Sequence, residues 1–334
     1  MAQIDKKYHE LVNTILEKGR WQEDPNRQGV KRLNIPRYNF EYDLKDGFPA
    51  ITTKKLAWKS VVGELLWFLR GDTNIKYLLD NNIHIWDKDC FKYWYKNQVD
   101  KPTMRLEDFL NKTHYFSEIG DCGRIYGYQL RNFDGKIDQF KNLIEGLIKT
   151  PLSSEHIVTY QSPSDKGKQA LPPCHKGFQI MVYELTRQER VSLLPNDTPT
   201  VFLDYLNIPK YGFDLVWEQR SVDTFLGLPF NIASYTLLAH IIGVLVNMVP
   251  GKIYGDLRNV HLYDNSIDAV KEQLKRDCDK HGKCCLQIDN DVYIDAKKYQ
   301  NNTAMFLARL QIKDFTLENY ESYPQLKTEM LSRD

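Results

Sequence analysis

The chain has 334 residues, a formal net charge of +1, and a composition that is 42% hydrophobic and 12% aromatic. These values allow a sizeable core, and we expect one domain, because large sheets keep chains of this length in a single unit. The near-zero charge excludes the broad basic surface that duplex nucleic acid requires, so an anionic ligand must be met by individual Arg or Lys side chains. We therefore expect a small ligand.

The six cysteines lie far apart in the chain, and the first residues contain no apolar stretch that could act as a signal peptide. Both features favour a reducing compartment, and we expect a cytoplasmic protein without a disulfide framework. The longest apolar run, Ile232 to Val249, contains Ser234, His240 and Asn247. It falls short of the ~20 residues that a bilayer span requires, so we interpret it as a buried core helix and expect no membrane association.

The N-terminal part of the chain predicts a helix, a basic turn and an extended segment. Apolar residues at helical spacing mark the helix over residues 8–16. The basic turn, Arg27 to Arg32, surrounds Gly29 and precedes the extended residues 38–44. Such a turn contacts a phosphate or is simply solvated, and the sequence leaves both interpretations open.

A carboxylate interrupts the next predicted helix. Apolar residues at helical spacing predict a helix over residues 61–69, and Glu64 lies inside this stretch. A buried Glu needs a partner or a function, because desolvation raises its pKa and favours the neutral form. Glu64 either faces the interior for such a reason or lies on the solvent side of the helix.

Weaker patterns follow in the middle of the chain. Residues 83–86 end in Trp86 and indicate a strand or a turn, and residues 88–119 indicate an elaborated surface region. Tyr126 lies between Gly123 and Gly127, which would let its hydroxyl approach a ligand closely, although a packed loop tyrosine fits as well. Residues 137–148 then predict an amphipathic helix.

The second half predicts a long hairpin and a strand. Two β-like segments lie between Phe178 and Trp217, separated by turn-rich residues 194–199, so we expect an insertion over about residues 186–212. Further on, His261 and Tyr263 alternate on one face of a probable strand, where they are two ligand donors or two packed rings. A helix is expected over residues 266–276.

Two motifs carry the chemistry of the chain. Cys174 and His175 follow Pro172 and Pro173, which offers a sulfur nucleophile beside an imidazole. A cysteine before a histidine is weak evidence alone, because most cysteines are small buried hydrophobes. Arg220 strengthens it, since its segment could fold back and favour the thiolate. We infer nucleophilic catalysis on a nucleotide.

A third cluster, residues 278–285, contains three cysteines and one histidine. Thiolates and imidazole are typical zinc ligands, but this spacing matches no zinc pattern and the segment reads as a lysine-rich loop. We therefore predict no metal site.

Several motifs spread over the chain are specific to one family. They are Asp46 to Pro49 with Thr52 to Lys54, Glu64 to Leu69, Ile85 to Asp87, Ile125 to Gly127, Leu171 to His175, Gln219 to Tyr235, and His261 with Tyr263. With these motifs the chain resembles the folate-dependent thymidylate synthase family, from Tyr8 to about Met330. The motif Pro172 to His175 and the ending Leu326 to Met330 look closer to its eukaryotic branch. The resemblance implies an α+β fold, with a large mixed sheet packed against helices and one sheet face at a homodimer interface.

The resemblance also implies a reaction and its residues. Cys174 would attack C6 of the uracil of dUMP, so that C5 takes up a methyl group from 5,10-methylenetetrahydrofolate, giving dTMP and dihydrofolate. The catalytic residues would be Cys174, Glu64, Tyr126, His175, Asn231 and Arg220. Substrate would be bound by Arg27, Arg220, Ser221, Asn231, His261 and Tyr263, and the folate by Lys54, Trp86, Asp223 and Gly227. The folate acts as cosubstrate, and no metal is implied.

The chain departs from the family pattern at three places. An arginine pair that reaches the partner subunit's phosphate is expected where this chain has Ser154 and Glu155. Lys166, Lys168 or His156 would then substitute, or nucleotide affinity would be weaker, or the substrate phosphate would differ. The aspartate expected before His261 is Asn259, and the tail at residues 331–334 extends slightly beyond the usual terminus, which would alter its closure over the folate.

Two alternative functions stay open at this point. A dUMP hydroxymethylase would use the same intermediate and quench it with water instead of hydride. An inactive family member would survive as a nucleotide- or RNA-binding protein, and RNA binding is therefore kept as a possible partner activity. The missing arginine pair motivates the second alternative, while Cys174, Arg220, Asn231 and Tyr126 oppose it.

Overall fold

The fold is that of a computed structural model, which describes residues 3–25, 27–116, 118–194, 199, 201, 203–328 and 331. Its helices are α1 (Gln3–Lys18), α2 (Trp58–Leu69), α3 (Lys76–Asp80), α4 (Asp87–Lys96), α5 (Leu106–Thr113), α6 (Tyr126–Asn132), α7 (Gln139–Lys149), α8 (Arg187–Ser192), α9 (Gly227–Val246), α10 (Ile267–Leu274), α11 (Asn290–Lys298) and α12 (Thr303–Arg309). Its strands are β1 (Arg20–Glu23), β2 (Lys31–Asp43), β3 (Ile157–Thr159), β4 (His175–Glu184), β5 (Tyr211–Gln219), β6 (Val222–Asp223), β7 (Val249–Tyr263), β8 (Cys285–Ile288) and β9 (Phe315–Glu318). Single turns of 3₁₀ helix lie at Leu44–Asp46, Pro163–Asp165, Asp264–Ser266 and Ile312–Asp314.

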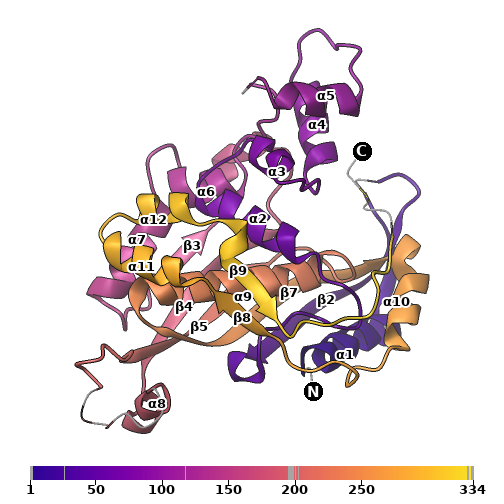
Figure 1. The fold of residues 1–334 in the computed structure, drawn as a ribbon. Coiled ribbons are helices and arrows are strands. Elements are labelled where there is room, and N and C mark those ends of the chain that lie inside the picture. The colour runs from indigo at the N-terminus through magenta and orange to yellow at the C-terminus, as the bar shows by residue number, and fades with distance from the viewer. Residues whose placement is uncertain are drawn as a thin grey trace.

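One large sheet organises the molecule, with strands in the order β1-β2-β7-β5-β4-β3 and with β6 paired to β7 (Figure 1). β7 runs parallel to β5 and β6 and antiparallel to β2, and the remaining neighbours in this sheet are antiparallel. β8 and β9 form a separate two-stranded sheet. The mixed sheet packed against helices confirms the expected α+β class.

The apolar run is the core helix α9, which packs against α2, α7 and the strands of the large sheet. Its side chains are buried on most sides, as expected for a helix that is apolar all round. The helix is longer than expected: with 20 residues and a mean hydropathy of 1.6, it alone among the described helices is long and apolar enough to cross a membrane. Length therefore does not exclude a span, but 67% of this window is buried within the protein, which supports the prediction of a core helix.

The N-terminal helix is anchored by a buried carboxylate. Asp5 accepts hydrogen bonds from the backbone N–H groups of Thr52 and Thr53, at 3.0 Å, and from both of their hydroxyls, at 2.8 and 2.7 Å. A carboxylate that accepts several hydrogen bonds can remain buried without a cation. The Thr52-Thr53 motif thus holds α1 against the rest of the fold.

Residues 88–119 form a projecting lobe that contains α4 and α5 (Figure 1). Phe91 and Trp94 of α4 pack against Phe109 of α5, with ring centroids 5.2 and 5.4 Å from the Phe109 ring. The elaborated surface region is confirmed, but the sequence missed its two helices, because this small aromatic core gives little helical periodicity.

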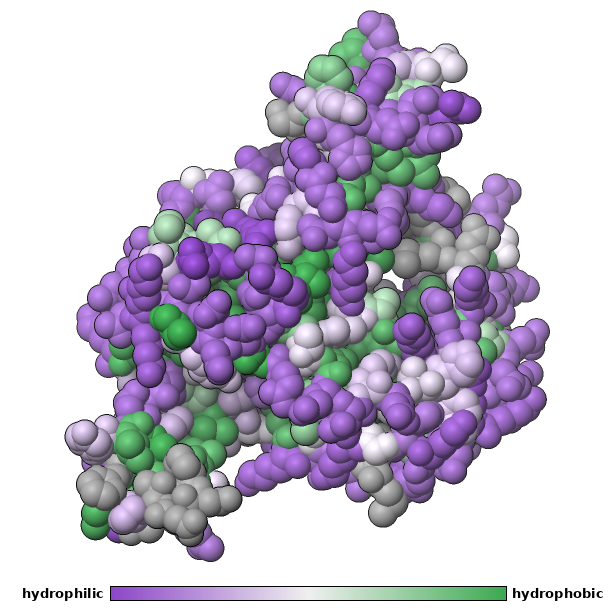
Figure 2. Space-filling view, viewed as in Figure 1, coloured by the Kyte–Doolittle hydropathy of each residue, from purple (hydrophilic) through white to green (hydrophobic). Residues whose placement is uncertain are grey.

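The predicted insertion is a hairpin excursion between β4 and β5, whose last pair in register is Glu184 with Tyr211. It contains α8, which begins with a capping box between Thr186 and Glu189. Figure 1 shows α8 standing away from the body, and Figure 2 shows apolar surface gathered beside it. Of the turn-rich residues 194–199, residues 195–198 lie outside the described part of the chain.

Candidate active site

A pocket of about 270 Å³ opens where the 171–175 segment, α2, α6 and the N-terminal end of α9 meet. The sequence-predicted residues that line it are Glu64, Trp86, Tyr126, Cys174, His175, Ser221, Asp223, Gly227 and Asn231. Residues from five separate stretches of the chain thus converge on one cavity. Arg27, Lys54, Arg220, His261 and Tyr263 are not among its lining residues.

The backbone of Cys174 is held on both sides. Its N–H donates to the Tyr126 hydroxyl oxygen at 2.7 Å, and its carbonyl accepts from the N–H of Arg220 at 2.8 Å. The preceding Pro172 and Pro173 restrict the approach of the chain, because each proline fixes its own φ. Cys174 therefore enters the pocket from a constrained backbone at the start of β4.

The Arg220 segment folds back against the cysteine, as expected. Its guanidinium donates from Nε to the Pro173 carbonyl at 2.7 Å and from an Nη to the Pro172 carbonyl at 2.9 Å. These bonds hold a permanent cation against the 172–174 backbone. Such a charge near a thiol favours the thiolate, which is the nucleophilic form.

His175 follows the cysteine at the start of β4 and also lines the pocket, where it is half-buried. Burial lowers its pKa to about 4, so the imidazole is neutral at pH 7. Its Nδ1 lies 3.2 Å from the Tyr235 hydroxyl, and its ring centroid is 5.4 Å from that of Tyr126. A neutral ring held between two phenols can accept or relay a proton but adds no positive charge.

The question of which way Glu64 faces is settled in favour of the interior. Burial raises its pKa to about 7, against the opposing effect of the hydrogen bond that Trp86 Nε1 donates to Oε1 at 2.7 Å. The carboxyl group therefore exchanges its proton near neutral pH, as a general acid or base requires.

A smaller cavity of about 30 Å³ adjoins this part of the pocket. Its polar lining residues are Glu64, Tyr126, Tyr160, His175, Asn231, Ser234 and Tyr235. The volume is enough for about one or two water molecules, and polar groups are close enough to bind them. A bound water could therefore connect the Glu64 carboxyl group to the Asn231 amide.

The amide of Asn231 is oriented by a second amide. Gln219 Nε2 donates to Asn231 Oδ1 at 3.1 Å and also to the Ser221 carbonyl at 3.1 Å. This contact fixes which end of the Asn231 amide is the acceptor and leaves its NH₂ group for another partner. Gln219 belongs to one of the family motifs but is not among the predicted site residues.

A second group of predicted residues lies beside the pocket, at the end of β7. The rings of His261 and Tyr263 meet edge to face at 4.8 Å between centroids, and Arg27 donates to the Tyr263 hydroxyl at 3.0 Å. Arg27 also donates to the carbonyl of Leu331, at 3.0 and 2.8 Å. The tail therefore reaches this group, although residues 332–334 lie outside the described part of the chain.

Lys54 does not line this pocket. It is buried, its ammonium donates to the Phe225 carbonyl and lies 3.6 Å above the Phe225 ring, and burial lowers its pKa to about 7. His156 is also buried, with Nε2 3.0 Å from the Thr150 and Pro151 carbonyls. The hypothesis that His156 replaces a phosphate-binding arginine is therefore wrong, because its ring faces its own backbone.

The sequence reasoning missed part of the lining. The additional lining residues are Phe68, Ile85, Asp89, Leu171, Gln219, Leu226 and Phe230. Helical spacing could have found two of them, since Phe68 lies one turn after Glu64 and Asp89 nearly one turn after Trp86. The described residues contain no group of three or more His, Cys, Asp or Glu side chains placed to hold a metal ion.

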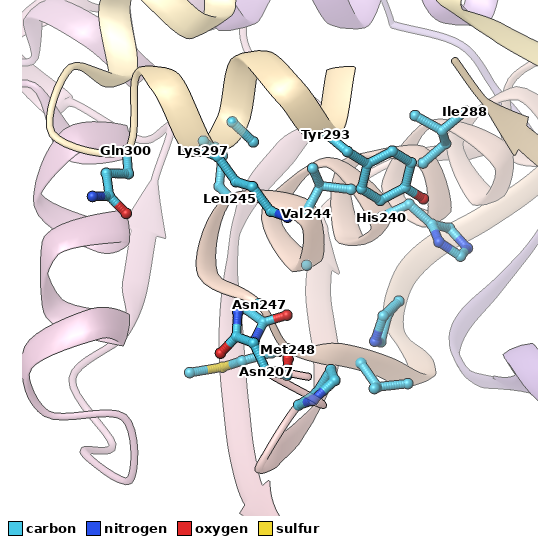
Figure 3. Close-up of a pocket in the computed structure, with 15 residues that line it drawn as sticks. Asn207, His240, Val244, Leu245, Asn247, Met248, Ile288, Tyr293, Lys297 and Gln300 are labelled. Carbon is cyan, nitrogen blue, oxygen red and sulfur yellow. Dashed lines mark hydrogen bonds between the residues drawn. The ribbon is translucent and has the colours of Figure 1, made fainter. Parts of the chain in front are cut away.

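A different cavity, of about 330 Å³, lies at the C-terminal end of α9 (Figure 3). Figure 3 shows Tyr293 and Lys297 extending from α11 toward α9, with Asn207 and Asn247 together on the other side. The Asn247 amide donates to the Asn207 carbonyl at 3.0 Å, which ties the insertion to the end of α9. Its described lining residues include no cysteine and no carboxylate, so it does not offer the thiol and acid that the first pocket brings together.

We therefore class the protein as an α+β enzyme whose chemistry takes place where the sheet, α2 and α9 meet. The family model described as thymidylate synthase matches residues 6–332. Thymidylate synthase of Mesoplasma florum is 34% identical over 330 residues, which covers 97% of this chain and 99% of the relative. Thymidylate synthase of phage T4 is 34% identical, covering 97% and 99%, and the probable thymidylate synthase of phage T5 is 37% identical, covering 98% and 100%.

The chain belongs to the thymidylate synthase family. It is accordingly a methyltransferase of dTMP biosynthesis, with methylenetetrahydrofolate as cosubstrate. Family and relatives favour this function over the hydroxymethylase and the inactive binding protein. The relatives reported above are bacterial and phage proteins, and the likeness of Pro172 to His175 to the eukaryotic branch stays a prediction.

Proposed function

We propose that the protein methylates dUMP at C5, with Cys174 as the covalent nucleophile, and converts 5,10-methylenetetrahydrofolate to dihydrofolate. The observation that carries the proposal is the convergence of Cys174, Glu64 and Asn231 on one pocket, with the Arg220 cation held against the cysteine backbone. These groups provide a nucleophile, a proton-transfer acid and an amide for the pyrimidine edge.

The bond changes follow from the position of Cys174. Its thiolate adds to C6 of uracil, forming an S–C6 bond and placing negative charge on C5. C5 then bonds to the one-carbon unit and loses its proton, and the bond between that carbon and the folate nitrogen breaks, so that the electron pair leaves on the nitrogen and an exocyclic methylene forms. Hydride from the released tetrahydrofolate reduces the methylene to a methyl group, and the S–C6 bond breaks to regenerate the thiolate, leaving dTMP and dihydrofolate. The folate supplies both the carbon and the hydride that completes the methyl group, so the protein mainly binds, orients and excludes water.

Proton transfer falls to Glu64 and the water-sized cavity beneath the pocket. With a pKa of about 7, Glu64 can release and recover a proton in each cycle. The cavity also touches His175 and Tyr126, and the Tyr126 hydroxyl oxygen accepts the Cys174 N–H. In this proposal water connects Glu64 to the carbonyl edge of uracil, while His175 and Tyr126 shape that water site.

Nucleotide binding is assigned to Ser221 in the pocket wall and to the residues beside the pocket. Arg27, Arg220 and Ser221 contact the phosphate, and His261 and Tyr263 contact the sugar hydroxyl. Arg27 already binds Tyr263 and the Leu331 carbonyl, so phosphate binding would exchange a neutral acceptor for an anion. With His156 buried, Lys166 and Lys168 remain candidates for the charge that Ser154 and Glu155 do not provide.

The folate is assigned to the outer part of the pocket. Trp86, Asp223 and Gly227 line it, and the apolar rings and side chains of Phe68, Ile85 and Leu226 widen that wall. Flat aromatic ligands favour such apolar surfaces with few polar groups. Lys54 would act indirectly, by holding Phe225 in place, and would not contact the folate itself.

We further propose a cytoplasmic homodimer formed through the outer face of β3 and β4. Ile157, Met181 and Tyr183 are 58%, 44% and 37% exposed there, and contiguous apolar surface of this kind favours a protein interface. The six cysteines, all within the described residues, form no disulfide, which supports a reducing compartment. A single domain over residues 1–334 and an additional affinity for RNA stay predictions.

Product mass tests the function directly. Purified protein is incubated with dUMP and methylenetetrahydrofolate, and the expected products are dTMP and dihydrofolate. A hydroxymethyl product with tetrahydrofolate would overturn the proposal in favour of the hydroxymethylase. A second measurement follows the covalent step: 5-fluoro-dUMP with the folate should form an adduct on Cys174, which Cys174→Ala abolishes. Absence of any adduct would favour a binding protein.

A further inference from the structure

Arg32 lies on the face of the sheet that carries His261 and Tyr263. It belongs to β2 and pairs directly with Tyr263 of β7, while Asn34 pairs with His261. Side chains of directly paired residues, and of residues two apart on a strand, point to the same face of a sheet. All four side chains therefore share one face.

This face leads to the wall of the catalytic pocket. Asn34 Nδ2 donates to Asn259 Oδ1, and Asn259 Nδ2 donates to Ser221 Oγ at 3.2 Å. Ser221 lines the pocket. Arg32 is thus two residues along β2 from a side chain that is hydrogen-bonded, through one other residue, to the pocket wall.

Arg32 shares a buried carboxylate with Arg27. Asp24, whose side chain is 1% exposed, has its Oδ2 atom 3.2 Å from Arg27 Nη1 and 3.7 Å from Arg32 Nη1. Because both contacts end on one oxygen atom, the two Nη1 atoms lie no further apart than the sum of these distances. The oxygens of one phosphate accept hydrogen bonds at about 2.8 Å, so a phosphate can bridge two guanidinium groups at such a separation.

The two arginines outnumber the carboxylate between them. A guanidinium group stays protonated in proteins, so one charge of the pair is left over when Asp24 is ionised. Burial raises the pKa of Tyr263 to about 12, and the positive charges of Arg27 and Arg32 act against this rise. The phenol is therefore neutral at pH 7, and the surplus positive charge at this end of β2 favours an anion.

The Arg32 guanidinium also has an unused hydrogen-bond donor. Its Nε is buried and has no hydrogen-bond partner among the described residues. Arg27, by contrast, donates to the Leu331 carbonyl from Nε and to the Tyr263 hydroxyl from Nη1. Buried polar groups in folded proteins are nearly always hydrogen-bonded, and an unsatisfied one calls for an explanation. An oxygen of a bound anion would supply the acceptor.

We propose that Arg32 is a further nucleotide-binding residue, which binds the phosphate of dUMP together with Arg27. The inference rests on the proposed function, because it takes dUMP as the ligand. Asp24 holds the two guanidinium groups close to one another. A phosphate monoester carries about −1.5 to −2 charges at pH 7, which two arginines balance better than one that Asp24 already neutralises in part. The chain thus supplies a cation of its own beyond Arg27 and Arg220.

Arg32→Gln tests the contact, because glutamine keeps a polar side chain and removes the charge. The dissociation constant of dUMP, measured by calorimetry without folate, should rise by about 10- to 100-fold. That of deoxyuridine, which has no phosphate, should change by less than about threefold in an NMR titration. Lys31→Gln is the matched control. Lys31 is exposed on the other face of β2, and losing one charge there should change dUMP binding by less than about twofold.

A second pair of variants separates a direct contact from a role in balancing Asp24. Without Arg32, Asp24 would neutralise more of the Arg27 charge, and this alone could weaken binding. Asp24→Asn removes that carboxylate. If Arg32 contacts the phosphate, Asp24→Asn/Arg32→Gln should still bind dUMP about tenfold or more weakly than Asp24→Asn.

Arg32→Lys covers the case in which Arg32→Gln does not fold, which urea denaturation checks. Lysine keeps the charge beside Asp24 but loses the planar fork, so it should weaken dUMP binding by about 3- to 10-fold without affecting deoxyuridine.

Unchanged dUMP binding by Arg32→Gln would overturn the inference, and so would equal losses for dUMP and deoxyuridine. Equal dUMP binding by Asp24→Asn and Asp24→Asn/Arg32→Gln would overturn it as well, because Arg32 would then act only through Asp24. The proposed function has its own readout: a wild-type protein that binds dUMP but forms no dTMP would refute the function and leave the binding comparison intact.

Discussion

The two ends of α9 line two cavities of similar size, about 270 Å³ at the N-terminal end and about 330 Å³ at the C-terminal end. The first gathers Cys174, Glu64, His175 and Asn231, and burial shifts the pKa of Glu64 to about 7 and that of His175 to about 4. The second contains His240, whose pKa burial also lowers to about 4, but no cysteine or carboxylate among its described lining residues. A perturbed pKa or a cavity alone therefore does not define a site, whereas convergence of complementary groups does.

The largest effect should come from the nucleophile at the N-terminal end. Cys174→Ala should lower kcat by about 10⁴-fold or more, because no other group can form the covalent bond. Steady-state dTMP formation measures it. Cys285→Ala, at an exposed cysteine, is the control and should keep wild-type activity; equal losses in both variants would mean that the effect is not covalent catalysis.

The next largest effect concerns the acid at the same end. Glu64→Gln should lower kcat by about 10²- to 10³-fold and remove the pH dependence of kcat near pH 7. Stability gives an independent readout. The raised pKa means that the neutral acid stabilises the fold below about pH 4.5, and this contribution is lost as pH rises through about 7.

His175 and His240, with pKa values of about 4, stabilise the fold as pH rises over part of the same range, so the Glu64 contribution is read from the difference between two proteins. The free energy of unfolding of the wild type minus that of Glu64→Gln, from urea denaturation, should fall by up to about 3 kcal/mol between pH 4.5 and 8. A difference between the two proteins that does not change with pH would argue that Glu64 is solvated and would weaken the contrast between the two cavities.

Two asparagines on α9 provide a direct comparison of its ends. Asn231→Ala should raise KM for dUMP by about tenfold, because an amide contact to the pyrimidine is lost. Asn247→Ala should leave KM unchanged and lower the free energy of unfolding by about 1 kcal/mol, because alanine fits poorly at a φ of +52°. Kinetics and urea denaturation of both variants would separate binding from stability, and a KM effect at Asn247 would break the comparison.

The smallest effect is expected at the C-terminal cavity. Lys297→Ala removes the ammonium group that extends toward α9 (Figure 3). It should change kcat/KM by less than about twofold, because the described residues give this lysine no contact with the catalytic pocket. A larger loss of kcat/KM would show that the two ends of α9 are energetically coupled.

The sequence predicted the elements whose patterns are local. The helical spacing around Glu64, the apolar α9 and the strand that carries His261 and Tyr263 were all confirmed. The fold-back of the Arg220 segment onto the cysteine backbone, expected from the benefit of a cation near a thiolate, was also confirmed.

The rest depended on contacts between distant segments. Trp86 is the partner that holds Glu64, and Gln219 orients Asn231, but neither pairing has a spacing that a sequence pattern could show. The phosphate-binding role predicted for His156 was wrong, and Lys54 lies away from the pocket wall, for the same reason. Both side chains are buried against backbone carbonyls, and such contacts form only in the folded protein. Helices α4 and α5 were missed because their core is a few aromatic rings.

The central place of β7 has a consequence for how the protein folds. β7 lies between β2 and β5 in the sheet, but in the chain it begins at Val249, whereas β2 ends at Asp43 and β5 at Gln219. The sheet cannot close until residue 263 has been synthesised, and such long-range pairing is slow because loop closure precedes any gain in contacts. Until then β2 and β5 expose unpaired edges to other chains, so the nascent protein is most prone to aggregation before the strand that completes its active site has left the ribosome.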